Sequence, residues 1–351
     1  MKFVAVDANP ATRTAPTGTE LYAREVTRRL PALAPDVGWR LYASRPALDF
    51  GADLTVLPFP RLWSQLRLPA ELLANRPSLL FVPAHAVPFV CPAPAVAVIH
   101  DLAYERFPDA YRPAQLAYLR LTTRWAAARC RRLIAVSEAT RDDLARFYRV
   151  RPERVTVVHS GGGEFALDGA QPRPRLQQLG IDRPFALHVG RIEARKNQAA
   201  ALAAVERAGD DLLLVCAGEI VDQQLGAQLS ASPRCRALGR VTPAVRDALY
   251  REARLLLFPS LYEGFGFPVL EAMRSGLPVV ASPAGGVREV AGEAALYAEP
   301  GDVEGLAAAA RRVLDDSALR RRLVAAGKKR AAAFSWDRCA RGVLDVIRSE
   351  L

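Results

Sequence analysis

The sequence predicts an α/β protein built from two doubly wound, Rossmann-like parallel-sheet domains, and three observations carry this prediction. Short runs of Val, Leu and Ile alternate with amphipathic stretches along the whole chain. The chain has 351 residues, whereas one hydrophobic core rarely serves more than roughly 250–300 residues. Near the middle, residues 164–180 contain two prolines and no strand-like run, so we place the interdomain linker there.

The first half of the chain carries seven apolar runs with the length and composition of strands. They are FVAVDA (3–8), RLYAS (40–44), LTVLPF (54–59), LLFVPA (79–84), AVAVIHD (95–101), RLIAVS (132–137) and VTVVHSG (155–161). Amphipathic stretches such as 19–30 and 137–148 lie between several of them and have the periodicity of helices. Continuous apolar runs joined by helices are typical of parallel sheets that are covered on both faces.

The second half repeats this organisation with six further runs. They are FALHVG (185–190), LLLVCAG (212–218), RALGRV (236–241), LLLFPS (255–260), PVVASPA (278–284) and ALYAEP (295–300). We therefore predict one domain over residues 1–165 and a second over 166–334, followed by a final helix at 335–351. Ligands of open parallel sheets bind beyond the carboxyl ends of the strands, so two such sheets facing a cleft would bring two sets of strand ends together.

The charge of the chain is strongly basic, with a formal net charge of +11. Residues 112–154 are locally richer still, with 11 Arg against 4 acidic residues. A solvated, arginine-rich surface explains this most simply. A basic face for anionic lipid head groups is the sharper alternative. Nucleic acid is the least favoured partner, because no basic motif interleaved with aromatic residues occurs.

Cysteine usage and the N-terminal sequence favour a cytoplasmic protein. The five cysteines are odd in number and show no Cys-x-x-Cys spacing, which predicts reduced structural thiols. The start, MKFVAVDANP, has too short an apolar run for a signal peptide. Residues 78–99 carry no charge but four prolines, which predicts two buried strands and a loop instead of a membrane-spanning helix.

Two candidate site residues follow strands of the first domain. Thr17-x-x-Glu20 is a capping box, so Gly18 opens a helix whose free N–H groups favour an anion. A capped helix with nothing bound explains the same residues. His100 ends the fifth strand, where a buried structural histidine is the ordinary interpretation and a hydrogen bond to a sugar hydroxyl or a phosphate is the functional one.

A cationic cluster follows the first strand of the second domain, in GRIEARKN. Arg191 and Lys196 come after the strand, and Lys196 is expected to begin a helix, where a positive charge is unfavourable unless an anion binds there. Arginine suits phosphate oxygens with its planar fork and lysine with a compact charge. A solvated basic loop is the alternative, and Arg195 fits that alternative best.

The stretch EGFGFPVLE, 263–271, is the most informative part of the chain. It follows the strand LLLFPS, and Pro268 suits a helix start, so Glu263 is expected in the loop and Glu271 in the first helical turn. The two glycines permit close backbone approach, and the N–H groups of residues 265–270 are expected to point at a ligand. A carboxylate accepts hydrogen bonds from paired sugar hydroxyls.

Other chemistries lack their signatures in this sequence. No G-x-G-x-x-G, Walker loop or G-x-S-x-G occurs, and neither an Asp-x-Asp pair nor a His/Cys cluster indicates a metal site. We therefore expect no metal and no cofactor.

At this point the chain resembles the retaining glycosyltransferases of family four, which have the GT-B fold, and it looks most like the branch of bacterial polysaccharide mannosyltransferases. The resemblance covers nearly the whole chain. It rests on EGFGFPVLEAMRSGLPVVAS, GGVREVAG, GRIEARKN, AVSEAT, the HD after AVAVIH, HDLAYERFPDAY and the late FSW. It implies an acceptor-binding N-terminal domain, a nucleotide-sugar-binding C-terminal domain, and a final helix that crosses back onto the first.

The resemblance also implies roles for the candidate residues. Arg191 and Lys196 would bind the donor diphosphate, with Gly18 and Gly190 near it. Glu263 would contact the donor sugar, and His100 would lie beside that sugar. The remaining donor-binding residues implied are Gly264, Phe265, Gly266, Phe267 and Leu270 around the sugar, Glu271 on the ribose, and Val241 bordering the base. The chain departs from the family pattern at two places. The first loop has one glycine, Gly18, where many relatives have two, and AGE at 217–219 lacks a second glycine found in some members.

The implied reaction is metal-independent hexosyl transfer with retention, from a nucleotide-sugar to a glycan or a lipid-linked acceptor in cell-surface polysaccharide synthesis. The first-choice donor is GDP-mannose and the second a UDP-hexose. A nucleotide-sugar epimerase and a non-enzymatic nucleotide- or carbohydrate-binding subunit are the alternatives. The basic segment 112–154 is consistent with peripheral binding to the inner face of the cell membrane.

Overall fold

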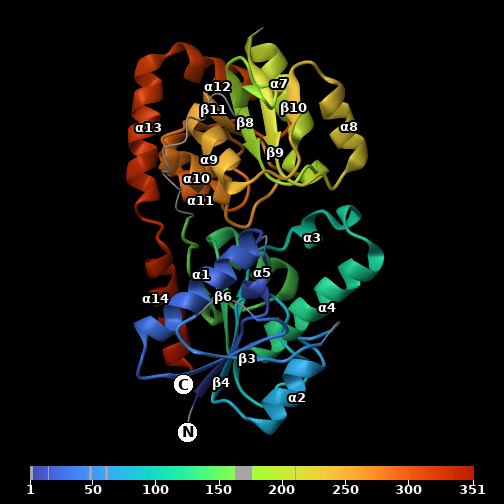
Figure 1. The fold of residues 1–351 in the computed structure, drawn as a ribbon, viewed down its shortest axis with the longest axis vertical. Coiled ribbons are helices and arrows are strands. Elements are labelled where there is room, and N and C mark those ends of the chain that lie inside the picture. The colour runs from blue at the N-terminus through green and yellow to red at the C-terminus, as the bar shows by residue number, and fades with distance from the viewer. Residues whose placement is uncertain (1–2, 15, 47–49, 60–61, 163–175, 210) are drawn as a thin grey trace. The chain divides into compact units, whose positions relative to one another are not determined.

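The computed structural model describes residues 3–14, 16–46, 50–59, 62–162, 176–209 and 211–351. The chain divides into two compact units (Figure 1). Unit 1 comprises Met1–Gly161 and Phe334–Leu351, and unit 2 comprises Gly162–Ala333. The predicted linker, 164–180, lies outside the described residues as far as residue 175.

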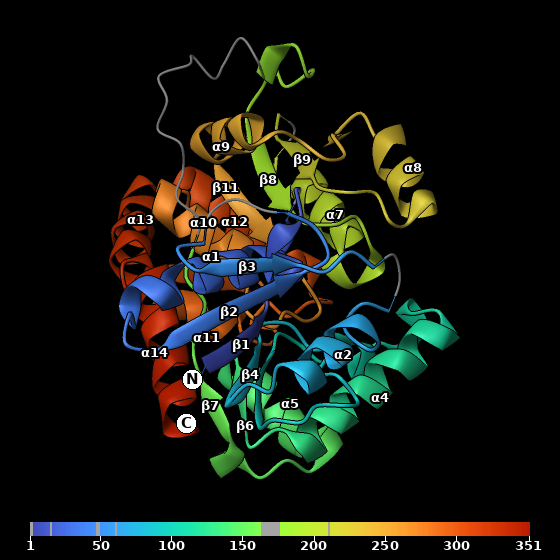
Figure 2. The ribbon, with the colours of Figure 1, turned by 60° about the horizontal axis from the view of Figure 1, so that its bottom comes forward.

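Unit 1 contains a parallel sheet whose strands match the seven apolar runs of the first half. The strands are β1 (Phe3–Asp7), β2 (Gly38–Ala43), β3 (Asp53–Val56), β4 (Leu79–Val82), β5 (Ala95–Ile99), β6 (Arg132–Ala135) and β7 (Val155–Val157). Their order is β3-β2-β1-β4-β5-β6-β7, and all neighbouring pairs are parallel (Figure 2). The order reverses between β1 and β4, as in a doubly wound Rossmann sheet.

The helices of unit 1 come from both ends of the chain. They are α1 (Gly18–Leu33), α2 (Arg67–Ala74), α3 (Ala103–Arg106), α4 (Pro113–Arg129), α5 (Glu138–Tyr148) and α14 (Trp336–Ser349), with the 3₁₀ turns η1 (Pro10–Thr12), η2 (Pro108–Ala110) and η3 (Pro152–Arg154). The last helix, α14, packs beside the first, α1 (Figure 1). The Arg29 Nε atom lies 2.7 Å from an Asp337 carboxylate oxygen, and the Ser335 hydroxyl caps α14.

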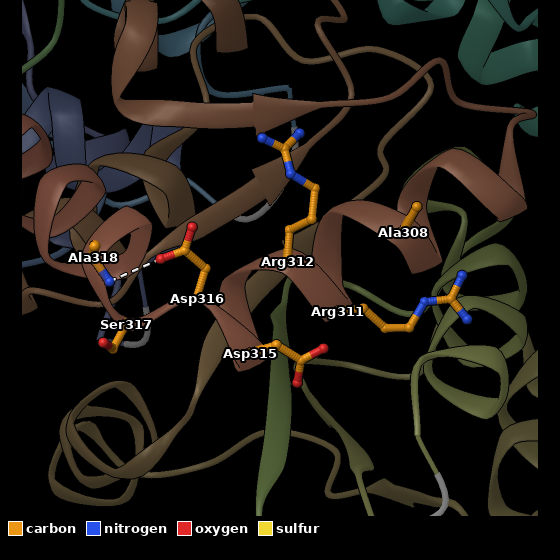
Figure 3. A pocket seen from close by; sticks show the side chains of 7 residues that line it. All are labelled: Ala308, Arg311, Arg312, Asp315, Asp316, Ser317 and Ala318. Atoms are coloured by element: carbon orange, nitrogen blue, oxygen red, sulfur yellow. Dashed lines mark hydrogen bonds between the residues drawn. The ribbon is translucent and has the colours of Figure 1, made fainter.

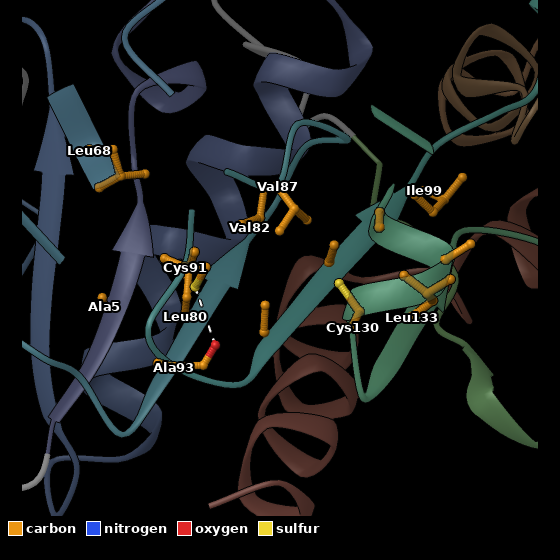
Figure 4. Packing of buried hydrophobic residues seen from close by; sticks show 14 of the residues in the cluster. Ala5, Leu68, Leu80, Val82, Val87, Cys91, Ala93, Ile99, Cys130 and Leu133 are labelled. Carbon is orange, nitrogen blue, oxygen red and sulfur yellow. Dashed lines mark hydrogen bonds between the residues drawn. The ribbon is translucent and has the colours of Figure 1, made fainter. Parts of the chain in front are cut away.

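The core of unit 1 fills the space between the sheet and its helices (Figure 4). Leu80, Ile99 and Leu133 from neighbouring strands are fully buried in it, together with Cys91 and Cys130. All five cysteines of the chain are free and buried, which confirms the prediction of unpaired thiols. Burial raises the pKa of the Cys130 thiol to about 12, so this group stays protonated at neutral pH.

Unit 2 repeats the same sheet topology with six strands. They are β8 (Phe185–Val189), β9 (Leu213–Ala217), β10 (Cys235–Ala237), β11 (Leu255–Phe258), β12 (Val279–Ala281) and β13 (Ala295–Tyr297), in the order β10-β9-β8-β11-β12-β13. All neighbouring pairs are again parallel. Here the order reverses between β8 and β11. The two sheets confirm the predicted fold class.

The helices of unit 2 cover both faces of its sheet. They are α7 (Gln198–Ala208), α8 (Gln223–Ala231), α9 (Pro243–Glu252), α10 (Phe267–Ser275), α11 (Val287–Ala291), α12 (Val303–Asp315) and α13 (Ser317–Ala331), with η4 (Ala194–Lys196) and η5 (Gly292–Ala294). Ala201, Leu214, Leu257 and Leu306 are fully buried in its core. Helix α7 begins two residues later than predicted, because Lys196 lies in a 3₁₀ turn and Asn197 is left-handed, with φ 57°.

The uncharged segment 78–99 forms β4, a proline-containing loop and β5, as predicted. In the part of the chain that the structure describes, no helix has both the length and the apolar character needed to cross a bilayer.

We expect Gly161→Ala to destabilise unit 1, because the return of the C-terminal segment depends on this glycine. An alanine Cβ there would lie 2.5 Å from the backbone nitrogen of Trp336. Overpacking of this kind typically costs about 1–3 kcal/mol. The melting temperature of the full chain should therefore fall by several degrees, measured by circular dichroism.

The matched control is Gly301→Ala, where no neighbouring atom lies within 4 Å of the added Cβ. It should melt within about one degree of the parent chain, as unstrained surface substitutions do. Equal melting temperatures for the Gly161→Ala variant and this control would contradict the close packing.

Candidate functional site

The candidate site of unit 2 lies where the strand order of its sheet reverses. The loops after β8 and β11 leave the sheet side by side, because these two strands are paired. The first loop carries Gly190, Arg191 and Lys196, and the second carries Glu263 and Gly264. The carboxyl ends of the two strands at which the order reverses are the usual ligand site of doubly wound sheets.

Lys196 and Glu263 form a buried ion pair across these two loops. The Lys196 Nζ atom lies 2.5 Å from Glu263 Oε1, and the two residues are only 8% and 7% exposed. Burial acts to raise the pKa of Glu263, but the charges of Lys196 and Arg195 outweigh it and hold the pKa below 4.5. The carboxylate is therefore ionised at neutral pH and compensates the buried lysine.

Arg195 belongs to the same cluster, so its interpretation as a solvated loop residue is wrong. It is 7% exposed, and its guanidinium donates to the carbonyl of Tyr262 at 2.7 Å and to Glu193 at 2.8 Å. The other Glu263 oxygen lies 3.8 Å away. Arg191 differs from both cations: its side chain is half exposed and its nearest described carboxylate oxygen, on Glu193, is 3.7 Å away. Arg191 can therefore turn toward a ligand.

The lysine is also placed differently from the prediction, which put it at a helix N-terminus. The turn η4 presents Lys196 toward Glu263, and the following left-handed Asn197 anchors this turn. The Asn197 side-chain amide donates to the carbonyls of Pro259 and Pro300 at 3.2 and 2.7 Å. The position of the lysine thus comes from a tethered turn, and its charge is balanced by a carboxylate before any ligand binds.

A pair of glycines, Gly285 and Gly286, holds the loop that carries Glu263. The sequence alone did not indicate this role. An added Cβ at Gly285 would lie 2.1 Å from the Glu263 carbonyl oxygen, and one at Gly286 would lie 2.5 Å from that of Gly264. The Gly286 N–H donates to the same Glu263 carbonyl at 2.9 Å. Only residues without a Cβ can approach this backbone so closely, which explains the GG of GGVREVAG.

Helix α10 begins directly after this loop. Gly266 precedes it in a left-handed conformation, with φ 102°, and no side chain caps the helix. The N–H groups of residues 265–270 were predicted to be free for a ligand, but this is wrong for the last two. Those of Val269 and Leu270 donate to the Gly266 carbonyl at 3.1 and 3.2 Å. Phe265 and Phe267 stack edge to face, with ring centroids 5.2 Å apart.

Glu271 lies in the second turn of α10 instead of the first, and it has its own partners. The Tyr250 hydroxyl donates to Glu271 Oε2 at 2.7 Å, and Arg246 Nη1 lies 3.9 Å from Oε1. Burial raises the pKa of Glu271 above 4.5, in spite of Arg246 and Tyr250, which act to lower it. Both α9 residues went unnoticed in the sequence, because nothing in PAVRDALYRE marks them as site residues.

Three glycines bring the loops after β8, β9 and β10 together. The Gly190 N–H donates to the Ala217 carbonyl, and the Gly218 N–H donates to the Gly239 carbonyl. An added Cβ on Gly218 would lie 2.0 Å from the Gly190 carbonyl oxygen, so glycine is required there. Val241 follows Gly239 by two residues in the loop after β10 and is partly exposed.

A buried histidine connects the two strands that precede these loops. His188 on β8 donates from Nδ1 to the Leu257 carbonyl at 3.0 Å, and its Nε2 accepts from the Gln198 amide at 3.2 Å. Burial lowers the pKa of His188 to about 4, so it is neutral at pH 7 and adds no further charge. The strand pattern FALHVG indicates a core histidine, but not that it links β8 to β11.

In unit 1, Gly18 opens α1 as predicted, but an internal anion already lies at this helix start. The Glu20 carboxylate accepts from the Thr17 N–H and from its hydroxyl, both at 2.7 Å. This contact completes the carboxylate half of the predicted capping box. A bound anion would therefore have to share the N-terminus of α1 with Glu20.

His100 lies at the end of β5 and is buried. Its Nε2 donates to the Pro83 carbonyl at 2.8 Å, and the Tyr22 ring contacts it edge-on. Burial lowers its pKa to about 4. The ring is therefore neutral, with Nδ1 as an acceptor, which suits a hydroxyl donor better than a phosphate. His85 lies close by, with its ring centroid 6.3 Å from that of His100.

Unit 1 also contains a pocket of about 750 Å³ beyond the carboxyl ends of β1, β2 and β3. Its lining combines hydrogen-bonding, basic and aromatic side chains. These residues are Asn9, Thr12, Arg13, Ser44, Arg45, Pro58, Phe59, Leu62, Trp63, Ser64, Gln65 and Tyr118. Polar groups beside aromatic faces are suited to an oligosaccharide or another polyhydroxylated ligand. Among the described residues, no group of three or more His, Cys, Asp and Glu side chains is arranged to hold a metal ion.

Two family models match the chain, one on each unit. The model described as Glycosyl transferases group 1 matches residues 175–330, and the model described as Glycosyltransferase Family 4 matches residues 16–161. Together they span most of the described chain, including Gly18, His100, Lys196, Glu263 and Glu271.

Relatives and solved structures agree with these matches. O-antigen chain mannosyltransferase B of Escherichia coli is 29% identical over 266 residues, covering 72% of this chain and 70% of that protein. Alpha-maltose-1-phosphate synthase of Mycolicibacterium smegmatis is 32% identical over 242 residues, covering 62% of each chain. Sucrose-phosphate synthase from Thermosynechococcus elongatus superposes with a TM-score of 0.79 at 20% identity, over 99% of both chains, which shows a shared fold.

Proposed function

The chain belongs to the family-four glycosyltransferases of the GT-B fold, and we propose that it is a retaining hexosyltransferase with GDP-mannose as donor. The acceptor we propose is a glycan or a lipid-linked oligosaccharide of cell-surface polysaccharide synthesis. The observation that carries the proposal is the buried Lys196–Glu263 pair, placed beside Arg191 where the strand order reverses. The similarity to an O-antigen chain mannosyltransferase supports mannose as the sugar.

The donor diphosphate would bind between Arg191 and Lys196. Arg191 has a half-exposed guanidinium that can form a bidentate contact with phosphate oxygens. The Lys196 ammonium group would contact a phosphate oxygen as well as Glu263. Gly190 and Gly18 would lie close to the diphosphate. Glu263 keeps lone pairs for donor sugar hydroxyls, because a carboxylate has about four acceptor positions. Gly264, Phe265, Gly266 and Phe267 would line the sugar.

Glu271 would hold the two ribose hydroxyls. Its Oε2 atom is kept in place by the Tyr250 hydroxyl, while Oε1 is the more available oxygen, with Arg246 at 3.9 Å. Val241, in the loop after β10, would border the base. Leu270, fully buried in α10, supports this helix from within and would act only through packing.

We propose that transfer occurs by front-face attack. The bond from the sugar C1 to the diphosphate oxygen breaks while the acceptor oxygen bonds to C1 on the same face. The acceptor proton passes to the departing phosphate oxygen, so retention needs no enzyme nucleophile. The tight pairing of Glu263 with Lys196 supports this, because a salt-bridged carboxylate is a poor nucleophile. Arg191 and Lys196 would stabilise the developing charge without a metal.

His100 would accept a hydrogen bond from a hydroxyl of the transferred sugar. Its neutral ring and free Nδ1 fit this role, and a low pKa argues against use as a cation. It is a positioning group in this scheme, because it holds the sugar and takes no proton from the acceptor.

The acceptor would bind in the unit 1 pocket described above, next to a candidate membrane surface. Leu62 and Tyr118 line this pocket and are 62% and 41% exposed, and Leu121 on α4 is 56% exposed. Arg112, at the start of α4, and Arg124, within it, are also exposed. Several other arginines of 112–154 are already engaged, since Arg120, Arg132 and Arg141 pair with carboxylates and Arg154 donates to carbonyls. Few arginines of this segment would therefore be available for lipid head groups, and the exposed apolar residues would add to membrane binding.

An epimerase would consume the donor without any acceptor, and a binding subunit would leave it intact. Product analysis after incubation with the donor alone, and then with an acceptor, distinguishes all three. The cation cluster favours a transferase, because a binding subunit needs no group to stabilise a leaving diphosphate.

We expect Lys196→Ala and Glu263→Ala to lower turnover by about 100-fold or more, since losing one such electrostatic contact raises a barrier by about 3 kcal/mol. The assay follows sugar transfer in the presence of excess chelator. Activity that disappears with chelator would overturn the metal-free mechanism, and near-normal rates in either variant would remove the pair from the proposal.

Each single variant leaves one buried charge unpaired, which can itself cost about 3–5 kcal/mol of stability. The double variant Lys196→Met/Glu263→Gln removes both charges, so it should melt near the parent chain and remain inactive. As a matched control, Arg207→Ala removes an exposed arginine of α7, whose partner Glu304 is also exposed, and should retain full activity.

A thermal-shift panel of GDP-, UDP- and ADP-sugars tests the proposed donor. GDP-mannose should raise the melting temperature most, because a ligand at 100 times its Kd stabilises the native state by about 2.7 kcal/mol. The Lys196→Met/Glu263→Gln double variant should show a much smaller shift. A larger shift with a UDP-hexose would replace the donor but not the reaction, whereas no shift with any member would contradict both.

Membrane association is tested by sedimentation with anionic phospholipid vesicles. Binding should occur at low salt and decrease as salt screens the arginines. Tyr118→Ser/Leu121→Ser should weaken it about tenfold or more, since each buried apolar side chain contributes about 1.5–3 kcal/mol. The control Val221→Ser changes an aliphatic residue of unit 2 that is 51% exposed and should have no effect. Absence of binding at low salt would reject the membrane proposal.

A further inference from the structure

Unit 2 contains a pocket at the opposite end of its strands from the loops that carry Lys196 and Glu263. The pocket has a volume of about 840 Å³ and lies at the amino ends of the strands. Pro184, Arg254 and Pro278 line it, and each directly precedes the strand β8, β11 or β12. Its other walls come from the ends of α9 and α10 and from one face of α13. This pocket is therefore separate from the loops that carry Lys196 and Glu263, which follow the carboxyl ends of β8 and β11.

The lining of this pocket is strongly and uniformly positive. It includes the five cationic residues Arg251, Arg254, Arg320, Arg321 and Lys328 and no acidic residue. The remaining lining residues are apolar or uncharged: Pro184, Tyr250, Ala253, Ser275, Gly276, Leu277, Pro278, Leu314, Val324 and Ala325. The α13 residues recur at intervals of one, three or four positions, which places them on one side of the helix.

Helix chemistry accounts for only part of this charge. Arg320 donates to the carbonyls of Val313 and Leu314 and so closes the end of α12. Arg251 and Lys328 lie in the last turns of α9 and α13, where positive charge is favoured by the helix dipole. Arg321 lies near the start of α13 and Arg254 lies outside any helix, so the dipole explains neither.

Four of these cations have no carboxylate within ion-pair distance. Among the residues that the structure describes, Arg251, Arg254, Arg321 and Lys328 form no ion pair. Arg321 donates to the Ser317 hydroxyl at 3.3 Å, and its charge helps to lower the pKa of the exposed Asp316, which does not line the pocket. Like charges that converge on one cavity repel each other, at a cost that an anionic occupant would remove.

A pocket of similar size nearby shows that this uncompensated charge is not general to these helices. That pocket, of about 690 Å³ between α12 and α13, is lined by Arg311 and Arg312 but also by Asp315 and Asp316 (Figure 3). Asp316 caps α13 by accepting from the Ala318 and Leu319 N–H groups. There, two aspartates offset the charge of two arginines, and the charge of Arg312 helps to lower the pKa of Asp316.

We propose that the basic pocket of unit 2 binds a soluble molecule that carries two or more phosphate groups. Arginine forks and a lysine provide charge-assisted hydrogen bonds to phosphate oxygens from several directions. Several cations match a ligand with a charge of several units, and the apolar wall of Leu277, Pro278 and Val324 accommodates its uncharged part. Binding of this molecule does not depend on the proposed sugar transfer.

The pocket shares one residue with the donor side of the unit. Tyr250 lines it, and the hydroxyl of the same residue donates to Glu271. The other donor-side residues, including Arg191 and Lys196, do not contribute to its lining. Substitutions in the pocket therefore leave the donor cations intact and can be assessed separately from them.

The test is calorimetric titration of the full chain with tripolyphosphate. The variant Arg321→Gln/Lys328→Gln removes two pocket cations, and the matched control Arg322→Gln/Lys329→Gln removes one arginine and one lysine one position along the same helix, outside the pocket. Any binding to the donor loops contributes equally in all three proteins. The pocket variant should lose affinity by about tenfold or more, because two charge-assisted contacts are removed, while the control stays within about twofold.

Equal weakening in both variants would assign the effect to net charge, and no weakening in either would exclude the pocket; each result overturns the proposal. A second arm measures sedimentation with phosphatidic acid vesicles. Loss of vesicle binding in the pocket variant, with tripolyphosphate binding unchanged, would identify a lipid head group as the ligand and overturn the soluble one. Melting temperatures equal to that of the parent chain show that each variant is folded.

Discussion

The buried ion pair between Lys196 and Glu263 is the constraint on which the candidate site depends. Two opposite charges removed from water are tolerated only when their geometry is good, so the loops after β8 and β11 must be held precisely. Asn197 anchors the lysine side through two carbonyls, and Gly285 and Gly286 support the carboxylate side by close backbone approach. The pairing of β8 with β11 then sets the distance between both loops.

The two carboxylates of EGFGFPVLE have environments that shift their pKa values in opposite directions. Cations lower the pKa of Glu263, whereas burial raises that of Glu271. Glu263 is therefore a fixed negative charge beside Lys196. Glu271 has a neutral donor, Tyr250, as its closest partner and is suited to accept hydroxyls. The two carboxylates, eight residues apart, thus have different surroundings, because Glu263 lies in a loop and Glu271 in helix α10.

The sequence predicted the strands and the loops of unit 2 well, because apolar runs and glycines report local backbone requirements directly. It did not reveal the role of Arg195, since a cation in a polar loop looks solvated until its carbonyl partner at Tyr262 is known. Tyr250, Gly285 and Gly286 were missed for the same reason: their partners lie 21 or more residues away in the chain. Contacts of this kind are set by packing, which no local pattern encodes.

The same distinction governs how the net charge of +11 should be interpreted. Most named arginines of 112–154 already donate to carboxylates or carbonyls, so a basic composition alone does not locate an anion site. Lys196 is compensated by Glu263, so its charge alone does not indicate a bound anion either. Arg254 and Arg321 face a cavity that contributes no acid. Cations without a local counter-charge carry an electrostatic cost that binding can remove, so they identify an anion site better than their number does.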